Sequence, residues 1–194
     1  MLYPQELIDF EEEVAARFTA GEIPGPIHLH SPSQAEPLIG IFQEVREEDW
    51  VLGNWRSHWH ALLKGVPRET VMAEILAGRS MMLHFPAHRF MSSAIMGGML
   101  PIGCGLAAGG SKVWCFVGDM CASTGAFRDA WKYSQGQGLP ITFIVEDNGL
   151  STNSPTREVW GSPLVPREST RESIRGYQYK RTVPHYGAGK YESF

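Results

Sequence analysis

The sequence has only three cysteines, no long apolar run and no excess of basic residues, and each scarcity excludes a class of protein. Cys104, Cys115 and Cys121 lack the spacing of metal ligands, and an odd number of cysteines favours free thiols over a disulfide framework. No apolar run approaches the ~20 residues that a helix needs to cross a bilayer. With 17 basic and 21 acidic residues the net charge is -4, so we expect neither nucleic acid nor a membrane as partner.

The remaining composition is typical of a globular protein, with 43% hydrophobic and 20% charged residues. A length of 194 residues suits a single domain. We therefore expect one domain over residues 1–194, with its core at about 33–157 and a C-terminal tail at 158–194. The first residues are acidic and lack the apolar segment of an export signal, which predicts a cytoplasmic location.

Apolar residues at helical spacing predict a helix over residues 5–20, and further helices are expected over residues 33–48 and 67–77, the last closed by Gly78. Ser33 is expected to cap the second helix, and Glu36, three residues later, to complete a capping box. The opposite face of the first segment carries glutamates.

Three other stretches differ from this pattern. Residues 50–54 indicate a short buried strand. The glycine- and alanine-rich stretch at 94–110 predicts a helix that packs closely against a neighbour, preceded by backbone that needs the freedom of glycine. Beyond Pro155 the chain becomes polar and irregular, and no element is assigned there.

The clearest unit lies in the second half of the chain. An apolar stretch at 112–117 predicts a strand, residues 125–137 a helix, and residues 141–145 a second apolar strand. This order is a βαβ unit, which implies a parallel sheet with a right-handed crossover. We therefore predict an α/β fold with an open, mostly parallel sheet flanked by helices.

Asp119 and Asn148 come directly after these two strands. Ligands of open α/β sheets bind at the carboxyl ends of the strands, so both side chains can reach one crevice. Their oxygens suit magnesium, and the following helix N-terminus suits a phosphate. The alternative is that Asp119 only caps the helix and Asn148 only occupies a turn. These two residues alone leave both readings open.

The sequence around them resembles the thiamine-diphosphate motif, in which GDG is followed some thirty residues later by NN. The matching stretches are Gly118-Asp119, Gly125-Ala126-Phe127, Leu139-Pro140-Ile141 and Glu146-Asp147-Asn148. They are similar to the alpha subunit of the thiamine-diphosphate-dependent decarboxylating component of 2-oxoacid dehydrogenases. The stretches at 54–65, 94–105 and 148–156 resemble further parts of that family, so the likeness spans about residues 10–157.

The resemblance implies a set of site residues. Asp119 and Asn148 would be side-chain ligands of Mg2+, and Leu150 would add its backbone carbonyl. Trp55 and Arg56 would contact the diphosphate, since a guanidinium fork suits phosphate oxygens. Met96 matches the bulky apolar residue over which the cofactor bends, with plain core packing as the alternative. The other cofactor-binding positions would contribute mainly backbone groups: Ala94, Gly118, Met120 and Cys121.

Some positions depart from the family pattern or leave alternatives open. Met120 stands where the family usually has glycine, so its side chain should point away from the diphosphate. Cys121 is either reactive or a buried inert thiol, and burial is favoured. His58 and His60 match an R-x-H-x-H pattern and would face the cleft as catalytic residues, with surface or supporting positions as the alternative. The chain is interpreted as internally shortened, which would bring a third catalytic histidine, His185, back to the site; otherwise His185 is a surface residue of the tail.

The resemblance finally implies a two-subunit enzyme that decarboxylates or cleaves a 2-oxo acid or ketose and transfers the acyl or ketol unit. A beta-like subunit would supply the glutamate that activates the cofactor, so we expect a heterotetramer and no activity from this chain alone. The alternatives are a carboligase or split-transketolase subunit without lipoyl transfer, and a non-catalytic assembly subunit. A nucleotide-binding module is disfavoured, because the glycines around Gly97 form neither G-x-G-x-x-G nor a P-loop.

Overall fold

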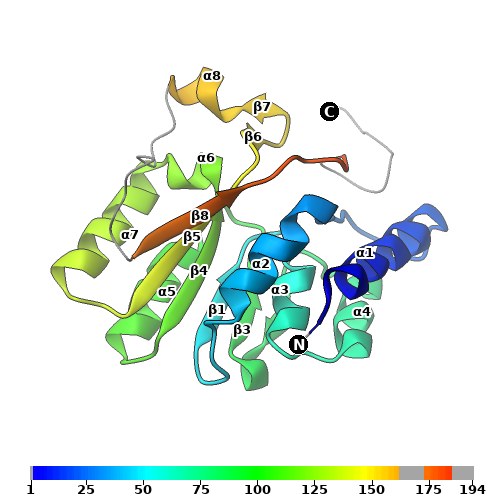
Figure 1. Cartoon of the computed structure of the whole chain (residues 1–194), viewed down its shortest axis with the longest axis horizontal. Coiled ribbons are helices and arrows are strands. Elements are labelled where there is room, and N and C mark those ends of the chain that lie inside the picture. The colour runs from blue at the N-terminus through cyan, green and yellow to red at the C-terminus, as the bar shows by residue number, and fades with distance from the viewer. Residues whose placement is uncertain (1, 162–172, 185–194) are drawn as a thin grey trace.

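A six-stranded sheet runs through the molecule, with helices on both of its faces (Figure 1). The computed structural model describes residues 2–161 and 173–184. The strand order is β2-β3-β1-β4-β5-β8, and all neighbours are parallel except the β2–β3 pair at one edge. The prediction of an α/β fold with an open, mostly parallel sheet is confirmed.

The elements have the following bounds. The strands of the main sheet are β1 (Trp50–Gly53), β2 (His84–Phe85), β3 (Phe90–Ser92), β4 (Val113–Gly118), β5 (Ile141–Asp147) and β8 (Ile174–Gln178). A separate hairpin consists of β6 (Leu150–Ser151) and β7 (Ser154–Pro155). The helices are α1 (Pro4–Thr19), α2 (Ala35–Phe42), α3 (His58–Leu63), α4 (Arg68–Leu76), α5 (Met99–Ala108), α6 (Asp119–Ala122), α7 (Gly125–Gly136) and α8 (Thr156–Trp160), with short 3-10 turns η1 (Pro32–Gln34) and η2 (Pro86–His88).

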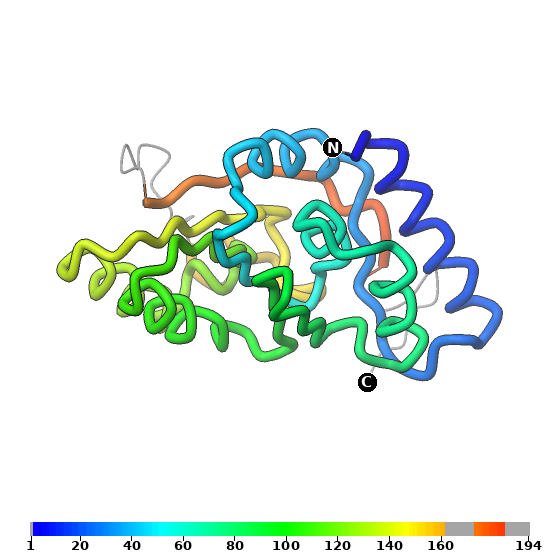
Figure 2. The backbone as a smooth tube through the Cα atoms, turned by 90° about the horizontal axis from the view of Figure 1, so that it is seen from below, coloured from blue at the N-terminus to red at the C-terminus, as the bar shows by residue number. Residues whose placement is uncertain are grey.

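The alternation of side chains along the strands divides the core into two layers. Trp114 and Phe116 of β4 pack into one hydrophobic cluster with α1, α2, α3 and α4, while Cys115 and Val117 pack into a second cluster with α5 and α7. Successive residues of a strand point to opposite faces, so a strand covered on both faces must be apolar throughout. Figure 2 shows helices from the two layers, α2 and α5, on opposite sides of the strands.

The glycine-rich stretch before and within α5 behaves as its composition predicts. Gly97 has a φ of 78°, a conformation that side-chain-bearing residues rarely adopt. A Cβ on Gly103 would lie 2.9 Å from the Ile141 side chain and 3.1 Å from that of Leu52. The absence of a side chain at Gly103 therefore lets α5 lie directly on the sheet.

The predicted helix at 33–48 is too long, and its predicted cap is wrong. The 3-10 turn η1 precedes α2, and the capping box joins Ser31 to Gln34, whose Oε1 accepts a hydrogen bond from Ser31 N at 3.0 Å. Helix α2 ends at Phe42. Beyond it Asp49 Oδ2 accepts hydrogen bonds from Arg46 N at 3.1 Å and from Trp114 Nε1 at 2.9 Å. This turn, anchored on the sheet, directs the chain into β1 instead of continuing the helix.

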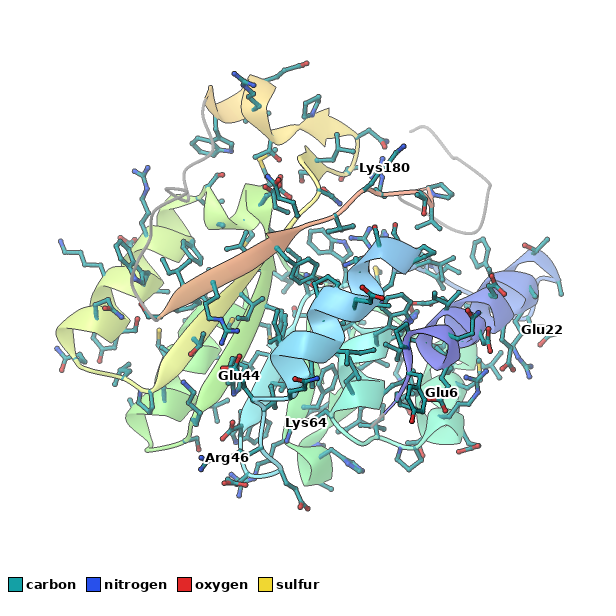
Figure 3. All side chains as sticks on the ribbon, viewed as in Figure 1. Glu6, Glu22, Glu44, Arg46, Lys64 and Lys180 are labelled. Carbon is teal, nitrogen blue, oxygen red and sulfur yellow. The ribbon has the colours of Figure 1, made fainter. Side chains whose placement is uncertain are left out.

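The chain beyond Pro155 is more regular than its polar sequence indicates. It contains α8 and the edge strand β8, which pairs with β5 in parallel register from Phe143↔Ile174 to Asp147↔Gln178. Arg175 of β8 also donates two hydrogen bonds to the carboxylate of Glu44 (labelled in Figure 3), from Nη1 to Oε2 and from Nη2 to Oε1, each at 2.7 Å. Within the described ranges, no helix has both the length and the apolar content to cross a membrane.

Candidate functional site

A pocket opens where β1, β4 and β5 end, at the carboxyl edge of the sheet. Parallel strands bring these ends to the same edge, so residues far apart in sequence meet there. The loop before α5 and the segment after β8 complete the wall. The polar lining residues are Asn54, Arg56, Ser93, Asp119, Glu146, Asn148, Ser151 and Tyr179.

Asp119 and Asn148 do lie in one pocket, together with Leu150. Asp119 Oδ2 accepts a hydrogen bond from the Thr156 hydroxyl, and within the described residues its carboxylate forms no ion pair. Burial and the nearby Asp147 raise the pKa of Asp119, and the Thr156 bond opposes this rise. A partly buried carboxylate that is paired with no cation of the described residues is a chemical environment that a divalent cation fits.

Asn148 is held at both ends of its side-chain amide. Its Oδ1 accepts a hydrogen bond from Leu150 N at 2.9 Å, and its Nδ2 donates to the Tyr179 hydroxyl at 2.7 Å. The turn that carries Asn148 thus closes on the hairpin strand β6. Asn148 thus occupies a turn, and Asp119 is the first residue of α6, whose N-cap is Gly118.

Arg56 presents a buried guanidinium at the opposite wall. Its Nε donates to the Leu29 carbonyl at 2.8 Å and its Nη1 to the Tyr179 hydroxyl at 2.9 Å. Its backbone N–H donates to Asn54 Oδ1 at 2.7 Å, which fixes the turn before α3. Two of the three guanidinium nitrogens are therefore used by the protein. The neighbouring Trp55 also lines the pocket, with its ring 6.1 Å from that of His28.

Glu146 contributes a buried carboxylate to this pocket and was not among the predicted site residues. It accepts hydrogen bonds from the Tyr177 hydroxyl at 2.6 Å and from Asn54 Nδ2 at 3.1 Å, and His60 Nε2 lies 3.2 Å away. Burial by itself raises the pKa of Glu146, but His60 and the other partners lower it to about 2. A charged residue in an otherwise apolar strand was the available signal for it.

His58 and His60 do not face the pocket; both are fully buried, so the expectation that they lie in the cleft is wrong. His58 Nδ1 lies 2.9 Å from Glu11 Oε2, and its Nε2 lies 2.8 Å from Ser80 Oγ. His60 packs edge-on against Phe116, and its contact with Glu146 lacks the alignment of a hydrogen bond. These histidines lie behind the pocket wall, and His185 lies outside the described residues.

A buried polar cluster joins α1 to this wall. The Glu11 carboxylate accepts hydrogen bonds from His30 N at 3.1 Å and pairs with His30 Nδ1 at 2.8 Å as well as with His58. The His30 ring stacks on Trp59 with centroids 4.6 Å apart. Burial lowers the pKa of His30 to about 4, so at neutral pH it is an uncharged donor to Glu11. Glu11 and His30 were also absent from the predicted set.

The other predicted positions lie along the rim. Gly118, Met120, Cys121 and Met96 line the pocket; Ala94 does not, although its neighbours Ser93 and Ile95 do. Met120 Sδ accepts a hydrogen bond from Trp160 Nε1 of α8 at 2.9 Å. The three cysteines are buried free thiols, and burial raises the pKa of Cys121 to about 11. Cys121 is thus buried, as expected, and its raised pKa disfavours the reactive thiolate.

Several known proteins are similar to this chain in sequence. The sequence model of the family described as dehydrogenase E1 component matches residues 5–163. The chain is 28% identical to the alpha subunit of an acetoin:2,6-dichlorophenolindophenol oxidoreductase of Cupriavidus necator, covering 75% of this chain and 48% of that protein. It is 31% identical to a pyruvate dehydrogenase E1 component subunit alpha of Rickettsia bellii, covering 87% of this chain and 56% of that protein. The chain thus spans about half the length of the curated relatives that it matches.

Proposed function

The chain belongs to the dehydrogenase E1 component family, and on this premise we propose that it is the cofactor-binding, alpha-type subunit of a thiamine-diphosphate-dependent enzyme that decarboxylates a 2-oxo acid. One observation carries the proposal: Asp119, Asn148 and Leu150 meet Arg56 and Trp55 in a single pocket. The names of the relatives, acetoin oxidoreductase and pyruvate dehydrogenase subunits, favour this activity over a carboligase or a non-catalytic assembly subunit.

The pocket residues fit a diphosphate and a divalent cation. Asp119 and Asn148 would hold Mg2+ through their side-chain oxygens and Leu150 through its carbonyl, while Arg56 would meet the phosphate charge. Bound thiamine diphosphate supplies the electron sink that decarboxylation requires. The chain would supply the anchor at the diphosphate end; the resemblance assigns Ala94 and Met96 to the pyrimidine end, and of these two Met96 lines the pocket.

Arg56→Lys is expected to weaken thiamine diphosphate binding by ~1–3 kcal/mol, because lysine keeps the charge but cannot also bond Leu29 and Tyr179. Titration calorimetry in the presence of Mg2+ measures the loss. Arg128→Lys, at an exposed position of α7, is the matched control and should bind as the wild type does. Equal affinity of Arg56→Lys and wild type would show that Arg56 does not contact the phosphate.

A beta-like partner subunit is part of the proposal. Ile95 and Met96 in the loop before α5 and Ile102 on α5 are exposed apolar residues beside the pocket, with 73%, 47% and 41% of their surfaces accessible. Large apolar groups left exposed next to a pocket are typical of an interface. We propose that the partner covers them and supplies the activating glutamate, in a heterotetramer whose interfaces bury on the order of 2,000 Å2 or more.

Coexpression tests the function and the assembly together. The chain alone is expected to have no 2-oxo acid decarboxylase activity, and the coexpressed complex to decarboxylate a 2-oxo acid only with thiamine diphosphate and Mg2+. Light scattering gives the mass of the complex, and an electron-acceptor dye measures turnover. Ile102→Glu should prevent assembly, whereas Tyr133→Glu, at an exposed site on α7, should not. Unaided turnover of a 2-oxo acid by a stable monomer of this chain would overturn the proposal.

A further inference from the structure

Two tyrosines, Tyr177 in the edge strand β8 and Tyr179 just after it, come from a part of the chain for which the sequence predicted no element, and Tyr179 lines the pocket. Tyr177 and Tyr179 are two residues apart, so their side chains point to the same face of the strand. Tyr179 N donates to the Asp147 carbonyl at 2.9 Å, which continues the β5–β8 pairing by one residue beyond Gln178. This register places the Tyr179 hydroxyl between the two walls of the pocket.

The Tyr179 oxygen joins the two halves of the site. It receives hydrogen bonds from Arg56 Nη1 at 2.9 Å and from Asn148 Nδ2 at 2.7 Å. Arginine can only donate, so the tyrosine oxygen must be the acceptor in that pair. One hydroxyl thus connects the cation that would meet the phosphate with the amide that would meet the metal ion.

The hydrogen bonds also fix which end of the Asn148 amide is the oxygen. Leu150 N is a backbone donor and lies 2.9 Å from the Asn148 side chain, so the end that faces it must be Oδ1. The end that faces Tyr179 must then be Nδ2. A metal ion requires Oδ1, and an amide that rotated by 180° would offer NH2 instead. The Leu150 N–H, which can only donate, opposes that rotation, and the bond from Nδ2 to the Tyr179 oxygen further stabilises the orientation that is present.

We propose that Tyr179 is a positioning residue of the metal site. Its hydroxyl holds the Asn148 oxygen toward the cation and fixes the position of the Arg56 guanidinium relative to Asn148. The inference rests on the proposed function, because it assigns Tyr179 a role toward the same cofactor. Tyr177 serves as a comparison, since its hydroxyl bonds Glu146 and Gln34 and neither Asn148 nor Arg56.

The test measures Mn2+ affinity by electron paramagnetic resonance, in the assembled complex at saturating thiamine diphosphate. Tyr179→Phe is expected to weaken Mn2+ binding by about 10–100-fold, the range found when partners that orient metal ligands are removed. Tyr177→Phe removes a buried hydroxyl from the same strand and should weaken Mn2+ binding much less. Tyr133→Phe, on the exposed face of α7, should have no effect. Equal losses for Tyr177→Phe and Tyr179→Phe would overturn the inference.

A double-mutant cycle separates positioning from general stability. Asn148→Asp offers a carboxylate oxygen in either orientation, so it should not need Tyr179. In that background Tyr179→Phe should weaken Mn2+ binding by less than a few-fold. A purely structural role would weaken Mn2+ binding equally in both backgrounds. If the wild type binds Mn2+ and thiamine diphosphate and Tyr179→Phe binds them equally, the inference fails and the proposed function stands. A wild type that binds neither would remove both.

Discussion

Asp119→Ala is expected to abolish magnesium-dependent binding of thiamine diphosphate while the chain remains folded. Asp119 is the carboxylate of the proposed metal site, and its pocket also contains Asn148 and Leu150. Loss of a direct ligand should exceed the ~10–100-fold cost of losing an outer partner, so binding should fall below detection in calorimetry. Asn148→Ala should have a similar effect, because it removes both the side-chain oxygen and the bond to Leu150 N.

The fold is expected to survive this change for a reason that the structure supplies. Burial raises the pKa of Asp119, so its ionised form is less stable in the folded chain than in water, and its removal relieves that cost. Asp129→Ala, at an exposed position of α7, is the matched control for the loss of one carboxylate. If both Asp119→Ala and Asn148→Ala bind the cofactor as the wild type does, the metal site is misassigned.

Glu11→Ala should lower the free energy of unfolding by ~3–5 kcal/mol, the cost of breaking a buried polar pair by removing one partner. Glu11 is the shared acceptor of His30 and His58, and its removal leaves two buried imidazoles without it. Glu12→Ala, on the exposed side of the same helix, is the control. Urea denaturation at pH 7 measures both variants. A loss for Glu11→Ala no larger than that of Glu12→Ala would show that the cluster does not stabilise the fold.

The same cluster predicts how stability depends on pH. Burial alone raises the pKa of Glu11, but His58 and His30 lower it from 4.5 to about 2. Because its pKa is lowered, the ionised Glu11 carboxylate stabilises the fold above pH ~4.5. This contribution, of the order of 3 kcal/mol, is lost as the pH falls toward 2. His30, with its pKa lowered from 6.5 to about 4, resists protonation in the folded state, so stability should begin to fall below pH ~6.5. The free energy of unfolding of Glu11→Gln should still fall between pH 6.5 and 4, as His30 becomes protonated. It should not show the further fall below pH 4.5 that Glu11 causes.

Local sequence determined the central βαβ unit and the position of the proposed metal ligands. The apolar strands β4 and β5 and the amphipathic α7 have clear periodicities, and a right-handed parallel crossover brings the residues after both strands to one edge. The βαβ unit alone is therefore sufficient to bring Asp119 and Asn148 to the same edge of the sheet. The close packing of α5 could also be predicted, because glycine at position 103 has few other reasons to stand in an apolar helix.

Only the tertiary structure decided where His58 and His60 point. The two residues are in α3, and positions two apart in a helix lie on different sides of it, so His58 turns toward Glu11 of α1 and His60 toward Glu146 of β5. The position of Tyr179 in the pocket could likewise not be predicted, because it depends on the pairing of β8 with β5, which are separated in sequence by an intervening segment. Sequence patterns report local geometry, whereas such partners are set by which distant elements come into contact.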